Sequence, residues 1–324
     1  MKNEQFDVIF LCGHLKERPH DGKTIGNHPR SDSLTWKRSE SPLFRATRGH
    51  DMGLIGRLKI GFAMARRSGR VLRSHPRLLA FPLLGGLSGA AFVATLLGGL
   101  YVMSPLLQDP GPAMYATLFV AYLLETFVAS FFTAALVAAT RTVYKGGEPS
   151  VREALAEAWQ RKLPLLAWSL VAAVIGVIIR LIESENNIVT QIVAGIFAVA
   201  WSVMTFFIIP VIVFRDPSVT EMFKQSARTF KDTWGESIGA LGTIDVVTFL
   251  LVLAGIVLGG LTFVVTTGLG TGQLLATLLI GGSAVSIGLF VGKALSGIAR
   301  TALYLYATQN TAPERFDDIN FSKI

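Results

Sequence analysis

The chain has 324 residues, of which 51% are apolar and only 16% are charged, and its mean hydropathy is +0.50. This composition is too apolar for a soluble globular protein of that length and is typical of a chain with several membrane-spanning segments. The net charge of +8 does not indicate nucleic-acid binding, because the basic residues lie beside apolar segments and form no separate basic domain. The single cysteine, Cys12, excludes an intramolecular disulfide and a thiolate metal cluster.

Residues 1–51 are polar and show neither helical nor strand periodicity, so we expect a disordered N-terminal extension. Four of the five histidines lie there, but their spacing with Cys12 fits no zinc signature. An alternative interpretation is that translation starts at Met52, because an amphipathic pattern begins directly after it.

Six apolar stretches follow, each near or above the ~20 residues that a helix needs to cross a bilayer. They cover residues 78–103, 114–139, 163–182, 188–214, 238–266 and 273–299. Lysine and arginine alternate with them: they are abundant before the first stretch, between the second and third, between the fourth and fifth, and after the sixth, and absent from the other gaps. Short cytoplasmic loops retain positive charge, so both termini are predicted to be cytoplasmic. The sequence thus predicts an all-α polytopic protein of the plasma membrane, with a six-span domain over 52–310 and a cytoplasmic tail over 311–324.

A basic amphipathic helix is predicted before each pair of apolar stretches, over residues 54–74, 150–162 and 218–232. The second and third begin with similar peptides, EPSVRE at 148–153 and DPSVTE at 216–221, which indicates an internal duplication. In both, a serine followed three residues later by a glutamate has the spacing of a helix capping box, with Ser150 and Ser218 as the N-caps.

Basic amphipathic helices of this kind lie in the headgroup layer of a membrane, where the apolar face is buried and the cations meet lipid phosphates. Anionic lipid headgroups are therefore the predicted partners, and nucleic acid is not. The alternative is that these helices form a docking surface for a cytoplasmic protein or gate a path through the membrane.

Several short peptides resemble an uncharacterised prokaryotic family of six-span membrane proteins, which is classed as a domain of unknown function. They are Phe207-Ile208-Ile209-Pro210-Val211-Ile212-Val213, Ser226, Trp234-Gly235, Phe81-Pro82-Leu83-Leu84, Gly147 to Leu155, and Leu303-Tyr304 with Tyr306-Ala307. The resemblance covers about 53–321. More distantly, the order of one helix and then two spans is similar to the membrane domain of glycerophosphodiester phosphodiesterases, whose catalytic barrel has no counterpart here. The resemblance implies no substrate and no site residues.

Glu125 is the sharpest functional candidate, because a carboxyl group inside a span is energetically expensive. Counting from residue 114 at ~1.5 Å per residue places it about 16 Å into the second span, near the bilayer centre. One interpretation is a neutral carboxyl group that holds two helices together by a hydrogen bond. The other is an ionisable group that lines a hydrated cavity, as a transporter requires. A cavity that reaches Glu125 would discriminate between them.

Asp245 and Lys293 form a candidate ion pair between the fifth and sixth spans. Asp245 comes early in the fifth span, and Lys293 comes ~30 Å after the start of the sixth, which returns it to the same boundary. The alternative is that each side chain reaches the headgroups separately.

Glycine pairs and a proline shape the later spans. Gly255 with Gly259, and Gly288 with Gly292, have the G-x-x-x-G spacing that permits close contact between helix backbones. Pro210 is predicted to kink or end regular helix in the fourth span.

The spans contain no histidine and no cluster of acids or nucleophiles of the kind that an intramembrane enzyme requires, and no cofactor or metal site is predicted. We therefore expect a non-enzymatic integral membrane protein with a scaffold, lipid-organising or partner-docking role. The alternative is a transporter or permease-like protein that uses Glu125.

Overall fold

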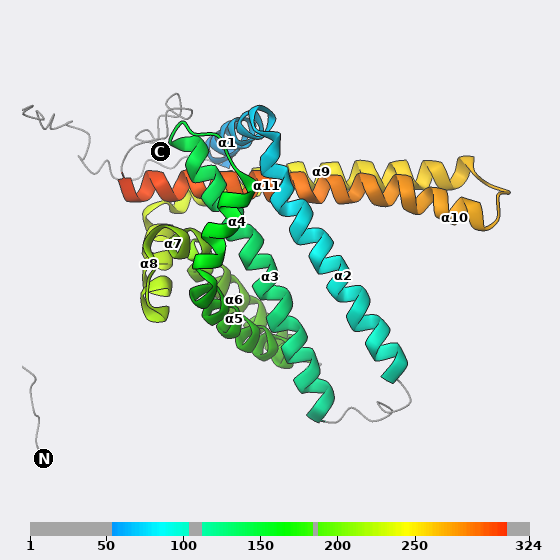
Figure 1. Ribbon diagram of the computed structural model, residues 1–324, viewed down its shortest axis with the longest axis horizontal. Coiled ribbons are helices and arrows are strands. Elements are labelled where there is room, and N and C mark those ends of the chain that lie inside the picture. The colour runs from blue at the N-terminus through cyan, green and yellow to red at the C-terminus, as the bar shows by residue number, and fades with distance from the viewer. Residues whose placement is uncertain (1–53, 104–111, 184–186, 310–324) are drawn as a thin grey trace, which may run out of the picture. The chain divides into compact units, whose positions relative to one another are not determined.

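The computed structural model describes residues 54–103, 112–183 and 187–309, which all belong to one unit of the chain, Thr47–Ile324 (Figure 1). The predicted N-terminal extension, 1–51, and the predicted tail, 311–324, lie outside the described residues. In chain order the elements are α1 (Leu54–Ser74), the 3₁₀-helix η1 (Pro76–Leu79), α2 (Ala80–Met103), α3 (Pro112–Tyr144), α4 (Val151–Gln160), α5 (Lys162–Glu183), α6 (Ile188–Thr205), α7 (Ile208–Arg215), α8 (Val219–Asp232), α9 (Trp234–Val265), α10 (Thr271–Thr277), the π-helical turn η3 (Leu278–Gly282) and α11 (Ser283–Gln309).

Six helical segments in the described part of the chain are long and apolar enough to cross a membrane. They run over Pro76–Thr95, Phe119–Tyr144, Lys162–Ile179, Ile188–Arg215, Gly242–Val265 and Thr271–Thr308. Each overlaps one predicted apolar stretch, so the all-α class with six spanning helices is confirmed. Large apolar side chains along these helices are exposed, such as Ile188 at 74% and Val265 at 82%, and this apolar surface is suited to lipid contact.

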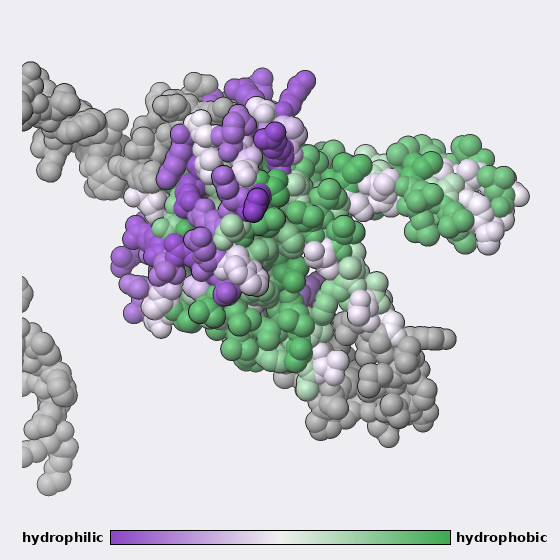
Figure 2. Space-filling view, in the orientation of Figure 1, coloured by the Kyte–Doolittle hydropathy of each residue, from purple (hydrophilic) through white to green (hydrophobic). Residues whose placement is uncertain are grey.

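The predicted amphipathic helices are α1, α4 and α8. In α8, Met222, Ser226 and Phe230 are buried on one face, whereas Lys224 and Arg228 are exposed on the other. This alternation follows the helical period and explains why the polar segment folds against the spans. In Figure 2 the hydrophilic residues gather over α1, α4 and α8, and hydrophobic residues cover the spanning helices.

The two predicted capping boxes differ. Ser150 is the N-cap of α4, and its hydroxyl oxygen accepts a hydrogen bond from the backbone N–H of Glu153 at 3.4 Å, as the S-x-x-E spacing predicts. Ser218 is the N-cap of α8, but its hydroxyl donates to the carboxylate of Glu221 at 3.4 Å and makes no bond to the backbone. The second box is therefore incomplete.

The hydrophobic core lies where α1, α3, α7 and α11 pack together. Every residue of the α3 run Ala134–Ala139 is buried, and this run belongs to the same cluster of buried residues as Ile212 of α7 and Ile298 of α11. Alanine side chains end at Cβ, so they allow helices to approach α3 on several sides. The core thus fixes one half of α3 among its neighbours.

The fourth span is divided into α6 and α7 by the turn at Phe206 and Phe207. Pro210 in the first turn of α7 has no N–H group, so it cannot continue the hydrogen-bond ladder from α6. The N–H of Phe207 leaves that ladder and donates instead to the hydroxyl oxygen of the buried Ser226 in α8, at 2.9 Å. The predicted interruption is confirmed, and α8 satisfies the backbone group that it frees.

Close contact between α9 and α11 depends on glycine. Gly259 faces Gly281 of η3, where a Cβ added to Gly281 would lie 2.5 Å from the Gly259 Cα. Gly255, Gly288 and Gly292 each lie against the opposite helix as well. The two G-x-x-x-G pairs therefore act as the sequence predicts, with Gly281 as an additional member.

Candidate functional site

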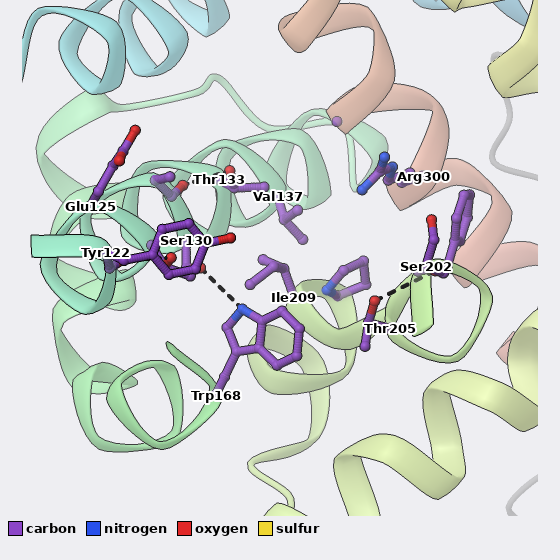
Figure 3. A pocket seen from close by; sticks show the side chains of 15 residues that line it. Tyr122, Glu125, Ser130, Thr133, Val137, Trp168, Ser202, Thr205, Ile209 and Arg300 are labelled. Carbon is purple, nitrogen blue, oxygen red and sulfur yellow. Dashed lines mark hydrogen bonds between the residues drawn. The ribbon is translucent and has the colours of Figure 1, made fainter. Parts of the chain in front are cut away.

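A cavity of about 410 Å³ lies beside α3 and reaches Glu125 (Figure 3). Its walls come from α3, α5, α6, the turn at Phe206, α7 and α11, so segments distant in the sequence meet there. The lining residues are Tyr122, Glu125, Thr126, Ala129, Ser130, Thr133, Val137, Trp168, Ser202, Thr205, Phe206, Ile209, Pro210, Gly297 and Arg300. The lining is mixed, with two ionisable side chains of opposite sign, several hydroxyl groups and an apolar remainder.

Glu125 lies at one side of this cavity, ~20 Å along α3 from Pro112. Its side chain is exposed, and none of the hydrogen bonds or ion pairs among the described residues includes it. The interpretation of Glu125 as an interhelical hydrogen-bonding contact therefore has no partner in the described residues. The interpretation of Glu125 as a cavity-lining acid agrees with its position.

The threonine hydroxyls of the cavity donate hydrogen bonds to backbone carbonyls of their own helices. Thr126, Thr133 and Thr205 each donate to the carbonyl four residues earlier, at 2.7, 2.7 and 2.8 Å. This local bonding is common for hydroxyls in spanning helices and leaves the oxygen lone pairs as acceptors. Hydroxyl groups thus place polarity along a wall of an otherwise apolar helix bundle.

Trp168 connects α5 to α3 at the cavity wall. Its indole N–H donates to the hydroxyl oxygen of Ser130 at 3.1 Å, and its ring stacks on Trp201 with the centroids 5.9 Å apart. Because Ser130 accepts this bond, its own O–H remains able to donate. The hydrogen bond and the stacked ring fix the position of Ser130 relative to α5 and α6.

Arg300 is a cavity residue that the sequence does not single out. The sixth apolar stretch is predicted to end at residue 299, which assigns Arg300 to the basic segment after it, but α11 continues to Gln309. The signal that reveals the longer helix is the apolar run from Ala302 to Leu305, which is buried in the structure. Arg300 therefore lies within a helix, not in a surface loop, and it lines the cavity.

The surroundings of Arg300 are largely apolar. Its guanidinium carbon lies 4.8 Å from the centroid of the Phe206 ring, and its Nε atom is buried without a hydrogen-bond partner in the described residues. No ion pair joins this guanidinium to Asp245 among the described residues. Arg300 and Glu125 lie on opposite sides of the view in Figure 3, and no ion pair joins them among the described residues.

The candidate pair Asp245 and Lys293 stays a prediction. Both side chains are exposed, and neither takes part in the ion pairs seen in the described part of the chain. Those ion pairs join Arg141 to Glu157 and Arg161 to Asp216, each at 2.7 Å. The first connects α4 to α3, and the second connects Arg161, the residue after α4, to the segment before α8; both lie outside the cavity lining.

Six apolar helical segments in the described part of the chain, each long enough to span a bilayer, define a multi-pass α-helical membrane protein, and a cavity of mixed lining lies among them. No group of three or more His, Cys, Asp or Glu residues in the described ranges could hold a metal ion. The chain belongs to the family of unknown function DUF6159, which matches residues 112–313 and therefore includes every cavity-lining residue. No curated protein and no solved structure matches the chain.

The family match confirms the predicted membership of an uncharacterised family with no assigned activity. It begins at residue 112, so α1 and α2 lie outside it, although the resemblance seen in the sequence starts at about residue 53. The comparisons provide nothing on a similarity to the membrane domain of glycerophosphodiester phosphodiesterases.

Proposed function

We propose that this protein is a non-enzymatic permease that binds a small solute in the cavity between its spans, with Glu125 as the ionisable group at one side. The observation that carries the proposal is the cavity of about 410 Å³ that reaches Glu125. Its size is in the range of small-molecule sites, and its few polar groups on largely apolar walls have the composition that such sites share. This observation favours the transport alternative over the scaffold role that the sequence alone suggests.

The divided fourth span supports the same proposal. In secondary transporters, substrate sites are typically formed beside interrupted helices, because irregular backbone at membrane depth is tolerated where it lines a cavity. Here the turn between α6 and α7 contributes Phe206, with Thr205, Ile209 and Pro210 beside it, to the cavity wall. A two-part helix can also change the angle between its halves, which is one way to open and close a cavity.

The lining supports a binding role rather than catalysis. It includes hydroxyl groups, one acid and one arginine, but no histidine or cysteine. A serine nucleophile would need a base within hydrogen-bond reach, and Ser130 bonds to Trp168 instead. The polar groups are suited to hold a ligand and not to activate a nucleophile.

Replacement of Glu125 by glutamine tests the proposal. We expect Glu125→Gln to reduce pH-dependent ion flux at least tenfold, because an amide keeps the size of the side chain but cannot ionise. The measurement is flux into proteoliposomes that contain a pH-sensitive dye, under imposed proton, sodium and phosphate gradients. Glu148→Gln is the control, since it removes the same charge from an exposed loop outside the cavity. Absence of flux in the wild-type protein under all gradients, or equal flux in Glu125→Gln, would reject the proposal.

A lipid-organising role is the second candidate, and the exposed basic residues of the amphipathic helices favour it. Those residues are Arg66, Arg70 and Arg73 on α1, Arg152 on α4, and Lys224, Arg228 and Lys231 on α8. Trp159 of α4 is 56% exposed, and the ammonium of Lys162 lies 4.8 Å from its ring centroid. An exposed tryptophan beside exposed cations suits the headgroup layer, where anionic lipids would be the partners.

We also propose that both termini are cytoplasmic and that the protein resides in the plasma membrane, on the basis of the alternating basic loops. Single cysteines introduced at Gly111, Asn186 and Gly270 in a Cys12→Ser background should react with an impermeant maleimide added outside intact cells. A cysteine at Lys224 should react only after permeabilisation. Labelling from outside at Lys224, or protection of any of the other three sites in intact cells, would contradict this orientation.

A further inference from the structure

We infer that the cavity binds the anionic group of its ligand, a phosphate or a carboxylate, at Arg300. The inference rests on the proposed function, because it names the class of ligand for the same cavity. It depends on Arg300 and its immediate surroundings, whereas the transport proposal depends on Glu125.

Arg300 has unused hydrogen-bonding capacity. The guanidinium group carries five N–H donors and remains charged at any physiological pH. None of the hydrogen bonds or ion pairs in the described part of the chain uses these donors, and the Nε atom is buried. Arg300 is half-buried, and its Nε–H has lost contact with water without gaining a hydrogen bond, which is unfavourable, so this group lacks a partner among the described residues. An anion in the cavity would be that partner.

Phe206 holds the guanidinium in place. The ring of Phe206 lies 4.8 Å from the guanidinium carbon and is itself packed edge-on against Phe207 and Phe230, with centroid distances of 4.5 and 5.1 Å. A cation over an aromatic face keeps the edge of the guanidinium plane free for hydrogen bonding. The planar fork of N–H groups matches two oxygens of a carboxylate or phosphate.

The nearby lining suits an anion better than a cation. Ser202 lies on the same side of the cavity as Arg300 in Figure 3, and Glu125 lies on the other side. Thr205 lies beside Ser202, but its hydroxyl donates to the carbonyl of Trp201, so it offers no donor to an anion. Asp245 forms no ion pair with Arg300 in the described part of the chain. The site that remains is one cation in largely apolar surroundings, with the Ser202 hydroxyl on the same side of the cavity.

Two sources could supply the anionic group. On α11, Arg300 lies one turn after Gly297, and Gly297 contacts Leu136 of α3. On α3, Leu136 lies about two turns before the end of the helix at Tyr144. This level is near the basic end of the spans, where the phosphate of an anionic lipid would lie. A soluble phosphate or carboxylate that enters the cavity has the same chemistry, so the experiment must compare the two.

The test uses the full-length protein in nanodiscs of neutral phosphatidylcholine. Inorganic phosphate and succinate are titrated in one arm, and phosphatidylglycerol replaces part of the lipid in the other. Affinity is measured by calorimetry for the soluble anions and by retained lipid in native mass spectrometry, and the unfolding temperature is followed in both arms. We expect at least one arm to bind and to raise the unfolding temperature, because a ligand that binds only the folded state stabilises it.

Arg300→Gln should weaken that binding at least tenfold, and Arg300→Lys should weaken it less, because lysine keeps the charge without the planar fork. Lys293→Gln is the matched control, since it removes an exposed cation from the same helix outside the cavity. If Arg300→Gln does not fold, the comparison of Arg300→Lys with the wild-type protein decides. Binding in the phosphatidylglycerol arm alone would identify a lipid headgroup, and binding in the soluble arm would identify a solute.

Binding in neither arm, or equal binding by the wild-type protein and both Arg300 variants, would overturn the inference. Glu125→Gln separates it from the proposed function. If Glu125→Gln keeps its affinity for the anion and flux is the same in the wild-type protein and in this variant, the transport proposal fails and the anion site at Arg300 stands. If flux is lost in Glu125→Gln and neither arm shows anion binding, the transport proposal stands and the anion site fails.

Discussion

Replacement of Gly281 by alanine is expected to destabilise the contact between α9 and η3 by about 1–3 kcal/mol. The added Cβ would lie 2.5 Å from the Cα and 3.2 Å from the backbone nitrogen of Gly259. These neighbours are backbone atoms, so a side-chain rotation cannot relieve the overlap, and the two helices have to separate. Separation would reduce the packing that holds the fifth and sixth spans together.

Gly282 provides a matched control because it is adjacent in the same π-helical turn but has no atom within 4 Å of an added Cβ. Gly282→Ala should be neutral or should stabilise the helix by up to ~1 kcal/mol, since alanine has the higher helix propensity. Reversible unfolding in mixed micelles of detergent and dodecyl sulfate would measure both variants. An equal loss of stability in the two would show that the glycine contact does not depend on close approach.

Removal of the Ser226 hydroxyl should destabilise the fold by about 1–3 kcal/mol. Ser226→Ala leaves the buried N–H of Phe207 without its acceptor at the turn between α6 and α7. At this turn the N–H of Phe207 makes no backbone hydrogen bond to the described residues, so no other acceptor is in place when the hydroxyl is removed. The same unfolding measurement applies, and tryptophan fluorescence should change as well, because Trp168 and Trp201 both pack against Phe223 of α8.

Ser169→Ala is the control for Ser226→Ala. Ser169 is equally buried, but its hydroxyl donates to the carbonyl of Leu165 in its own helix at 2.8 Å. That carbonyl can keep its helical hydrogen bond when the serine is removed, so we expect a change below ~0.5 kcal/mol, since such local bonds contribute little to helix stability. A Ser226→Ala effect no larger than the control would refute the role of Ser226 in capping the interrupted span.

Much of the fold could be predicted because membrane insertion depends on local sequence. The limits of α1, Leu54–Ser74, follow directly from its periodicity, and each spanning helix overlaps a predicted apolar stretch. A span has to satisfy its own backbone hydrogen bonds and remain apolar over ~20 residues, and both requirements can be read from a single segment. The N-cap of α4 is equally local, because Ser150 and Glu153 belong to the same turn.

The predictions were weaker at the N-cap of α8 and where two separate segments meet. The S-x-x-E spacing is identical in the two peptides, yet Ser218 bonds to the Glu221 side chain and leaves the cap incomplete, which the spacing does not explain. Pro210 marks the interruption of the fourth span, but the position of the turn depends on a bond to Ser226, which belongs to another helix. Sequence spacing does not contain that information, because it arises only when α8 packs against α7.

By itself, therefore, the sequence determined the helices, their apolar faces, the G-x-x-x-G contacts and the position of Glu125 within a span. Only the tertiary structure decided that Glu125 borders a cavity and that Arg300 lines the same cavity. The physical reason is that hydropathy and periodicity act within one segment, whereas a cavity is the space that several helices leave between them. Its walls combine α3, α5, α6, α7 and α11, and no local pattern in any one of these helices records how the others pack against it.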